Sequence, residues 1–223
     1  FHPDISGNAR YLAFESSSTN LVAGDTNGFN DVFVHDRQTG TSTRVSVASD
    51  GSQATDGGSS SPVLSADGRF VAFHSNATNL VAGDSNGLQD VFVHDLQTGA
   101  TTRASVASDG TQADSSSYYP RLSADGRYVA FSSDASNLVA GDTNGTFDVF
   151  VHDRQTGTTT RVSVASDGTQ ATKDCFYSVL SADGRYVGFY SGTTNLVAGD
   201  TNGMNDVFVH DRQTGTTTRV SVA

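Results

Sequence analysis

The sequence contains little of the material from which helices and disulfide frameworks are built. Its 223 residues include one glutamate, one lysine, one cysteine and no tryptophan, against 23 aspartates and 12 arginines. Glutamate and lysine are strong helix formers, whereas aspartate favours turns and caps. This bias excludes a helical bundle or a coiled coil. Valine, threonine and phenylalanine dominate the apolar runs, which is typical of β-strands. We therefore predict an all-β protein.

Positive charge is also scarce, and the formal net charge at pH 7 is -11. Nucleic-acid-binding proteins carry basic patches that neutralise phosphates, so we exclude nucleic acid as a partner. Anionic membrane surfaces are disfavoured for the same reason. No apolar run reaches 18 residues, so we expect no membrane insertion. The single cysteine, Cys175, cannot form a disulfide within the chain, and we expect it to have no chemical role.

The sequence consists of four copies of one unit. The string NLVAGD begins at Asn20, Asn79, Asn137 and Asn195, with spacings of 59, 58 and 58 residues. The copies are nearly identical, with 7 differences in 44 positions between 122–165 and 180–223. Self-similarity at a fixed period is the sequence signature of repeat architectures. We predict one domain, 1–223, with repeats at approximately 1–54, 55–113, 114–171 and 172–223.

Each unit has the pattern of four short strands. In the third copy we predict strands around 120–123, at 127–132, at 148–152 and at 159–164. Asp125-Gly126 is a two-residue hairpin signal between the first two strands. The first copy has Asn8-Ala9 there, so we expect a looser turn. Apolar residues on both faces of the middle strands suit sheets stacked between neighbouring sheets. A four-stranded unit repeated radially is a propeller blade.

The runs LSADGRYVAF and DVFVHDRQTGTTTRVSV resemble the repeat of TolB-type β-propellers, and the resemblance covers nearly the whole chain. It implies a β-propeller of four-stranded antiparallel blades, with four blades in this chain. Rings of this type often have six blades. A four-bladed ring and one half of an eight-bladed ring formed by two chains are therefore both open. The units are long for this repeat, and the extra residues lie between the second and third strands.

This insertion contains the motif Asp-x-Asn-Gly-x-x-Asp four times. Oxygen side chains at positions 1, 3 and 7, with a backbone carbonyl at position 5, resemble the opening of a calcium loop. We predict up to one Ca²⁺ for each blade. The predicted ligands are Asp25, Asn27, Phe29 and Asp31; Asp84, Asn86, Leu88 and Asp90; Asp142, Asn144, Thr146 and Asp148; and Asp200, Asn202, Met204 and Asp206.

A turn held only by hydrogen bonds is the alternative. Asn-Gly is itself a strong turn signal, and the flanking aspartates could accept hydrogen bonds from backbone amides. Three other recurring residue types are expected to be structural: histidines bonded within the blade, arginines paired with loop carboxylates, and core phenylalanines. They are His35, His94, His152 and His210; Arg44, Arg103, Arg161 and Arg219; and Phe14, Phe73, Phe131 and Phe189.

The positions at which the copies differ indicate a second candidate site. First strands line the axis of a propeller, so variable residues in and beside them are expected at one mouth of the channel. A mixture of aromatic, acidic and basic side chains there would suit a ligand or partner surface. The predicted residues are Asp4, Glu15, His74, Tyr119, Arg121, Tyr177 and Tyr190. Drift at tolerant loop positions is the alternative explanation.

The predicted function is that of a non-catalytic, calcium-stabilised propeller that serves as a binding or structural module. We expect a secreted or cell-surface bacterial protein, because extracellular calcium can fill weak sites. Its ligand would be a protein or a glycan, and self-association into a homo-oligomer is a further expectation. The alternative function is a carbohydrate-binding or glycan-active propeller that uses the variable mouth. Catalysis is not expected, because no G-x-S-x-G elbow occurs and a single glutamate cannot form a Glu-based acid/base pair.

Overall fold

The computed structural model describes residues 2–222, which form four antiparallel sheets of four strands each and, within that range, no helix. We call the sheets blades 1 to 4. Their strands are β1 (Asp4–Ile5), β2 (Tyr11–Ser16), β3 (Asp31–Asp36) and β4 (Thr41–Arg44); β5 (Ser59–Leu64), β6 (Phe70–Ser75), β7 (Asp90–Asp95) and β8 (Thr101–Arg103); β9 (Ser117–Leu122), β10 (Tyr128–Ser133), β11 (Asp148–Asp153) and β12 (Thr158–Arg161); and β13 (Cys175–Leu180), β14 (Tyr186–Ser191), β15 (Asp206–Asp211) and β16 (Thr216–Arg219).

The prediction of four blades in an all-β chain is confirmed. The strand order inside each blade is sequential, so every blade is a meander. The fourth strand is shorter than predicted in the third repeat, where β12 ends at Arg161. Beyond it Val164 makes only an isolated bridge with Gln170.

The hairpin between the first two strands of a blade is fixed by an Asp-Gly turn. In blade 3 the Ser123 hydroxyl donates to Asp125 Oδ1 at 2.6 Å, and the same oxygen accepts the N–H of Arg127 at 3.0 Å. Gly126 takes a φ of 69°, which an L side chain rarely adopts. The expected loosening in the first copy is wrong. Ala9 adopts a φ of 56° and its N–H donates to Ser6 O at 2.8 Å, so the turn is kept.

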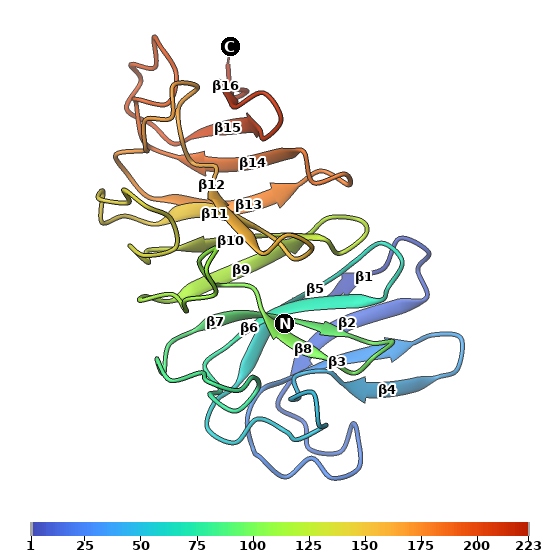
Figure 1. Ribbon diagram of the computed structural model, residues 1–223. Coiled ribbons are helices and arrows are strands. Elements are labelled where there is room, and N and C mark those ends of the chain that lie inside the picture. The colour runs from blue at the N-terminus through green and yellow to red at the C-terminus, as the bar shows by residue number, and fades with distance from the viewer. Residues whose placement is uncertain (1, 223) are drawn as a thin grey trace.

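The blades follow one another as an open arc. In Figure 1 blade 1, in blue, and blade 4, in red, lie at opposite ends of the row of sheets. The first strands of neighbouring blades contact one another, β1 with β5, β5 with β9 and β9 with β13. These four strands therefore line the inner edge of the arc.

The apolar core lies between the blades. Each cluster joins one face of a blade to the opposite face of the next blade, as when Val149 and Val151 of blade 3 pack with Phe189 and Phe208 of blade 4. Phenylalanines of the two middle strands stack within a blade, with centroids 5.8 Å apart for Phe131 and Phe150. The predicted core phenylalanines are fully buried in blades 2 to 4, whereas Phe14 in blade 1 is only half-buried.

An arginine–aspartate brace joins the second and third strands of each blade. In blade 3 Arg127 donates to both carboxylate oxygens of Asp153, at 2.8 and 2.6 Å. The guanidinium also lies over the Tyr128 ring, 4.8 Å from its centroid. This hydrogen bonding holds the pKa of the Asp153 carboxyl well below its usual range. Such bidentate pairs are stronger than single ion pairs. The same brace recurs as Arg10–Asp36, Arg69–Asp95 and Arg185–Asp211.

Residues 2–222 contain no helix that could cross a membrane.

Candidate functional site

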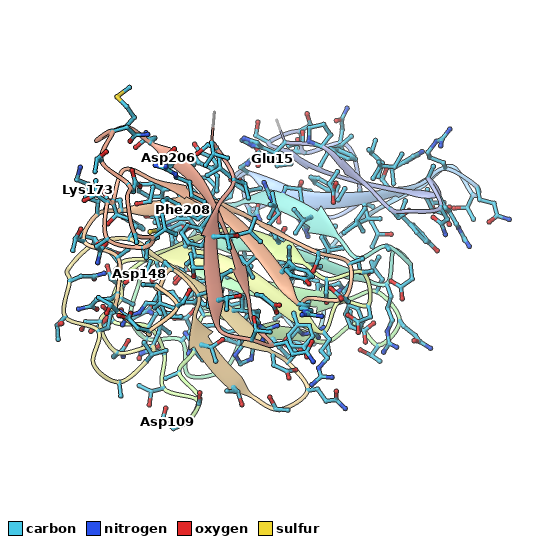
Figure 2. All side chains as sticks on the ribbon, turned by 90° about the horizontal axis from the view of Figure 1, so that it is seen from above. Glu15, Asp109, Asp148, Lys173, Asp206 and Phe208 are labelled. Atoms are coloured by element: carbon cyan, nitrogen blue, oxygen red, sulfur yellow. The ribbon has the colours of Figure 1, made fainter. Side chains whose placement is uncertain are left out.

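The insertion loops are compact turns closed by their asparagine. In the third repeat the Asn144 amide nitrogen donates to Asp148 Oδ2 at 2.9 Å and to Ala171 O at 3.0 Å. Its oxygen accepts the N–H of Thr146 at 3.2 Å. The asparagine oxygen at position 3 is therefore used within the turn. Asp148 and Asp206, at the starts of β11 and β15, lie on the side of the molecule where these loops gather (Figure 2).

Each loop brings its two aspartates to one arginine nitrogen. Arg161 Nη1 lies 2.8 Å from Asp142 Oδ1 and 3.3 Å from Asp148 Oδ2. Arg161 is 10% exposed and Asp148 is fully buried. The predicted pairing of these recurring arginines with loop carboxylates is confirmed. The equivalent pairs are Arg44 with Asp25 and Asp31, Arg103 with Asp84 and Asp90, and Arg219 with Asp200 and Asp206.

These contacts bear on whether the loops fit calcium. Two carboxylates converge on one point, as a cation site requires, and buried oxygens of Asp25, Asp84 and Asp200 receive no hydrogen bond of normal geometry. That point, however, is filled by the guanidinium nitrogen, and Asp148 Oδ1 already accepts the Ser163 hydroxyl. Within residues 2–222 no three acidic, histidine or cysteine side chains are grouped as metal ligands. The loops as they stand fit arginine and do not fit calcium. Calcium binding remains a prediction from the sequence that the structure does not support.

The recurring histidines are structural, as predicted. The Nδ1 atom of His152 lies 2.9 Å from the Thr159 hydroxyl, and His94 and His210 repeat this contact. Burial lowers the pKa of these imidazoles, which favours their neutral form. They lie on the third strand of each blade, away from the first strands that line the inner edge.

The inner edge of the arc carries an irregularity that recurs in blades 2 to 4. The pairing of β5, β9 and β13 with the second strand slips by a bulge in each blade. Inside the bulge Ser61, Tyr119 and Tyr177 have φ angles of 53°, 55° and 50°. A residue with a Cβ is strained there by roughly 1–2 kcal/mol. Strain of this kind motivates the hypothesis that these positions are shaped for function.

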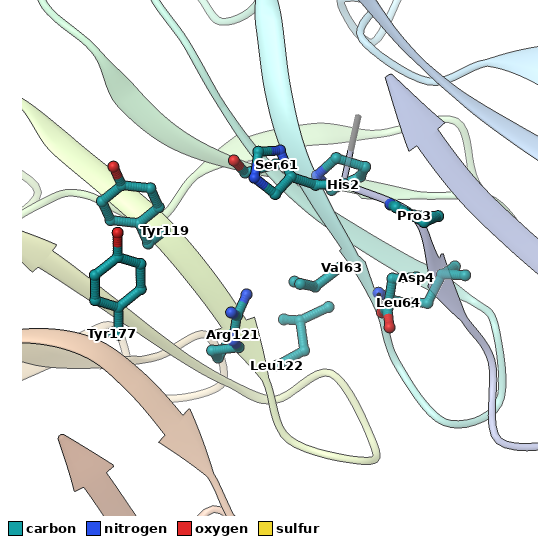
Figure 3. Close-up of a pocket in the computed structure, with 11 residues that line it drawn as sticks. His2, Pro3, Asp4, Ser61, Val63, Leu64, Tyr119, Arg121, Leu122 and Tyr177 are labelled. Carbon is teal, nitrogen blue, oxygen red and sulfur yellow. Dashed lines mark hydrogen bonds between the residues drawn. The ribbon is translucent and has the colours of Figure 1, made fainter. Parts of the chain in front are cut away.

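The bulge residues meet in one cavity. A hollow of about 640 Å³ is lined by Ser61, Tyr119 and Tyr177, by His2, which occupies the equivalent position of blade 1, and by Arg121. Figure 3 shows the two tyrosines one above the other, with their hydroxyl groups pointing the same way and Arg121 beside them. Four equivalent positions, which carry three different residue types, thus face the same space.

Tyr177 is enclosed by rings although half of its surface is exposed. It stacks on Tyr119 at 5.2 Å and on Tyr190 at 5.5 Å, measured between centroids, and it is 53% exposed. Two rings lie nearly parallel to that of Tyr177, and about half of the side chain remains accessible. The predicted residues Tyr119, Tyr177 and Tyr190 are therefore brought together.

The aromatic cluster extends to residues outside the predicted site. Tyr118 packs against Phe147 at 6.2 Å, and Phe147 packs against Phe176 at 5.0 Å. Phe147 immediately precedes Asp148, at a position where the other copies have Asn30, Gln89 and Asn205. The replacement of an amide side chain by phenylalanine in the third copy is the sequence feature that could have identified Phe147.

Two predicted mouth residues make contacts between blades. Asp4 Oδ2 accepts the N–H of Leu64 at 2.7 Å, and Glu15 Oε2 accepts the N–H of Ser61 at 2.7 Å. Asp4 and Glu15, both from blade 1, thus accept hydrogen bonds from the backbone of β5 in blade 2. Asp4 also lines the cavity, whereas Glu15 supports the strained bulge at Ser61.

His74 lies behind the cavity, inside the aromatic cluster. Its ring packs edge-on against Tyr118 and Tyr119, with centroids 5.6 and 6.1 Å away. Burial lowers its pKa to about 4, although the nearby Glu15 carboxylate acts in the opposite direction. The imidazole is therefore neutral at pH 7, and it does not line the cavity itself.

Arg121 differs from the arginines of the braces and loops. Its Nη1 donates to Pro120 O at 3.0 Å, and among residues 2–222 no carboxylate pairs with its guanidinium. Eight arginines elsewhere in the chain are paired with aspartates. Arg121 is half-buried in the cavity wall, so it offers a cationic donor to whatever enters.

Comparison with known proteins decides the fold. The sequence matches no protein-family model and no curated protein. The structure is similar to that of TolB from Acinetobacter baumannii, with a TM-score of 0.57 and 20% identity over 99% of this chain and 43% of that chain. It is also similar to putative TolB from Agrobacterium tumefaciens, with a TM-score of 0.61 and 15% identity over 100% of this chain and 61% of that one. The fold is that of a TolB-like β-propeller.

The likeness extends to a protease propeller. The β-propeller domain of the Trilobed protease from Pyrococcus furiosus, described as having an open velcro topology, gives a TM-score of 0.58 at 10% identity. It is matched over 100% of this chain and 56% of that chain. This TolB-like propeller thus spans less than two thirds of each of these proteins. At such identities the comparison establishes the fold alone. The function has to be inferred from the residues of the site.

Proposed function

We propose that this chain is a non-catalytic binding module that holds a segment of a partner protein in the cavity of the inner edge. The observation that carries the proposal is the convergence of His2, Ser61, Tyr119 and Tyr177 on one cavity from equivalent positions of four nearly identical blades. Two of these positions keep a tyrosine in a left-handed conformation that costs stability. A binding site explains why such strain is retained.

The chemistry of the wall indicates which segment binds. Within residues 2–222 no carboxylate pairs with the Arg121 guanidinium, and the stacked rings of Tyr119, Tyr177 and Tyr190, which we call the tyrosine ladder, lie in the same region. Guanidinium and phenol groups together suit a carboxylate flanked by apolar or aromatic groups. The ligand would therefore be an acidic peptide segment, held by Arg121 and contacted by Tyr119 and Tyr177.

Carbohydrate binding is the alternative function, because sugars commonly stack on exposed aromatic rings and Tyr177 is 53% exposed. The guanidinium of Arg121 in the same wall favours an anionic ligand over a neutral sugar.

We propose that the protein acts outside the cytoplasm, at or beyond the cell envelope of a bacterium. Support comes from the acidic, lysine-poor composition. Calcium is not part of this proposal, because an arginine nitrogen stands between the two aspartates of each insertion loop. Fractionation of the producing organism tests the location.

Selection from a displayed random-peptide library, run beside a glycan array, tests the function. We expect peptides enriched in aspartate, glutamate or a free carboxyl terminus, and no glycan signal. Enrichment should be lost with Arg121→Gln and retained with Lys173→Gln, which removes the same charge from an exposed position outside the cavity. Glycan binding that disappears with Tyr177→Ala would contradict the proposal, and so would peptide enrichment that survives Arg121→Gln.

A further inference from the structure

The two ends of the arc present apolar faces that are buried everywhere else in the molecule. We call the face of a blade that packs on the following blade its trailing face, and the opposite face its leading face. In blade 4 Val207, on the trailing face, is 44% exposed, whereas its equivalents Val32, Val91 and Val149 are fully buried. Val220 is 51% exposed on the same face, whereas Val45 is fully buried.

The leading face of blade 1 shows the same departure. Leu21 is 36% exposed, whereas Leu80, Leu138 and Leu196 are at most 2% exposed. Ile5 is exposed as well, in contrast to the buried Leu64. Both ends of the arc formed by residues 2–222 therefore present apolar side chains to solvent.

The exposed trailing face of blade 4 and the exposed leading face of blade 1 correspond to the two sides of the interface between consecutive blades. That interface occurs three times in the chain. Between blades 3 and 4, valines of the trailing face pack with Val187, Phe189 and Leu196 of the leading face. The other two interfaces combine the same kinds of residue. Blade 4 repeats the valines of the trailing face, and blade 1 repeats the leading residues as Leu12, Phe14 and Leu21.

A row of backbone hydrogen bonds between consecutive blades also stops at both ends of the arc. The N–H of Gly7 donates to Ala66 O, that of Ala66 donates to Ala124 O, and that of Ala124 donates to Ala182 O, at 2.8–2.9 Å. Each blade thus donates to the next one. In the described part of the chain the N–H of Ala182 and the C=O of Gly7 have no backbone partner, so the series ends with a donor and begins with an acceptor.

An arginine beside the Asn8-Ala9 turn completes the correspondence. Arg154 of blade 3 lies 4.4 Å above the Phe70 ring of blade 2, and Arg212 of blade 4 lies 4.3 Å above Tyr128 of blade 3. Arg37 is the equivalent residue in blade 1, but no blade precedes it in the arc. The ring equivalent to Phe70 and Tyr128 in blade 4 is Tyr186, which is exposed.

We propose that the trailing face of blade 4 binds the leading face of blade 1 in a second copy of this chain. Two copies joined in both directions form a closed pair, in which neither apolar face remains exposed. The contact is heterologous, because it joins two different surfaces, and two-fold closure prevents growth into a filament. The partner is a second copy because the missing half of each interface is present on this chain.

One position in the new interface is imperfect. At the three internal interfaces the turn glycine of a leading face packs against the aromatic ring of the preceding blade, and a Cβ at Gly184 would overlap Tyr128. Blade 1 has Ala9 at this position. Tyr186 must therefore shift to accept the methyl group. Ala9→Gly should tighten the association between copies.

Light scattering coupled to size-exclusion chromatography tests the proposal. We expect a mass of twice 23.2 kDa for the purified chain. Val207→Asp and Leu21→Asp should each give the single-chain mass, because every interface needs one intact face of each kind. Both side chains are exposed in the single chain, so neither change buries a charge. Lys173→Asp, at an exposed position between blades 3 and 4, is the control and should stay paired.

Mixing the two variants distinguishes this contact from a symmetric one. Val207→Asp keeps an intact blade 1 and Leu21→Asp keeps an intact blade 4, so the mixture should form a one-to-one pair. An isologous contact of blade 4 with blade 4 would leave Leu21→Asp paired by itself, which would overturn the proposal. A single-chain mass for the unmodified protein at all concentrations would overturn it, and so would an unlimited series of larger species.

A disulfide trap provides an independent readout. A Cβ at Gly7 would lie 3.3 Å from the Cβ of Ala66 across an internal interface, close to disulfide geometry. Gly7→Cys with Ala182→Cys should therefore cross-link two copies on oxidation. Cys175 does not compete, because it is buried and burial raises its pKa to about 12. A chain that stays single under these conditions would contradict the proposed contact.

Discussion

The rings of Tyr119 and Tyr177 stack with their centroids 5.2 Å apart, although the two residues lie 58 positions apart in the sequence. Each occupies the bulge of its first strand with a positive φ. The stack exists because two neighbouring blades place the same strained position side by side. It joins blades 3 and 4 at the point where the cavity opens.

Removal of the Tyr177 ring should have a small effect on stability. Tyr177→Ala loses two ring contacts, but half of the side chain is already exposed, so we expect a loss of about 1 kcal/mol in the free energy of unfolding. Tyr177→Phe should be close to neutral because both stacks remain. Urea denaturation measures the difference. A loss of several kcal/mol in Tyr177→Ala would instead make the ladder a part of the structural core.

Asp4 should stabilise the contact between blades 1 and 2. Asp4→Ala removes the acceptor of the Leu64 N–H and should lower the free energy of unfolding by about 1–2 kcal/mol. Asp4→Asn keeps an acceptor oxygen and should lose less. Hydrogen exchange at the Leu64 amide provides a local measurement. Unchanged protection of that amide in Asp4→Ala would contradict the assigned contact.

Arg161 should determine whether the third insertion loop responds to calcium. Arg161→Ala leaves the buried carboxylate of Asp148 unpaired, and we expect a loss of about 3 kcal/mol. Added Ca²⁺ should recover part of this loss, because the space between Asp142 and Asp148 is then vacant. In the unmodified protein the melting temperature should be the same in EDTA and in millimolar calcium.

Arg219→Ala is the matched variant in blade 4. Its guanidinium is more exposed than that of Arg161, at 21% against 10%, so its loss of stability should be smaller. A rise in the melting temperature of the unmodified protein with calcium would refute the assignment of the loops to arginine. It would then support calcium as a part of the fold.

His74 should make stability depend on pH. Its pKa is about 4 in the folded protein and 6.5 in its ordinary state, because burial disfavours the charged form. The unfolded chain therefore binds the proton more tightly. The stabilisation is fully present above pH 6.5 and falls as the pH drops toward 4, by about 2–3 kcal/mol between pH 7.5 and 4.5.

His74→Phe should remove this part of the pH dependence. The free energy of unfolding of the variant, relative to the unmodified protein, should rise by the same amount across that interval. Denaturation at several pH values measures it. Parallel pH profiles for the two proteins would show that His74 is not the group responsible.

The repeats and the strands could be predicted because they depend on local patterns. Alternating apolar residues, Asp-Gly turns and fourfold repetition all appear in the letters of the sequence, and the sheets follow them closely. The pairing of Arg161 with its loop carboxylates was also predicted. A recurring cation beside recurring acids has few other partners in a blade.

The detailed chemistry of the cavity could not be predicted. Nothing in the sequence marks Tyr119 or Tyr177 as residues with positive φ, because aromatic residues adopt that conformation only when tertiary contacts impose it. The use of Asp4 and Glu15 as acceptors for the β5 backbone depends on how neighbouring blades meet. Phe147 joins the cluster from an insertion loop, at a distance in sequence that no local pattern reports.

Titration with a selected acidic peptide tests the central claim of a binding cavity most directly. The chain has no tryptophan, so its emission comes mainly from seven tyrosines. Tyr119, Tyr177 and Tyr190 form the ladder, and Tyr118 packs beside it. We predict a saturable change in tyrosine emission for the unmodified protein and for Lys173→Gln, weakened at least tenfold by Arg121→Gln. Equal affinity in Arg121→Gln, or no saturable change with any peptide, would contradict the account.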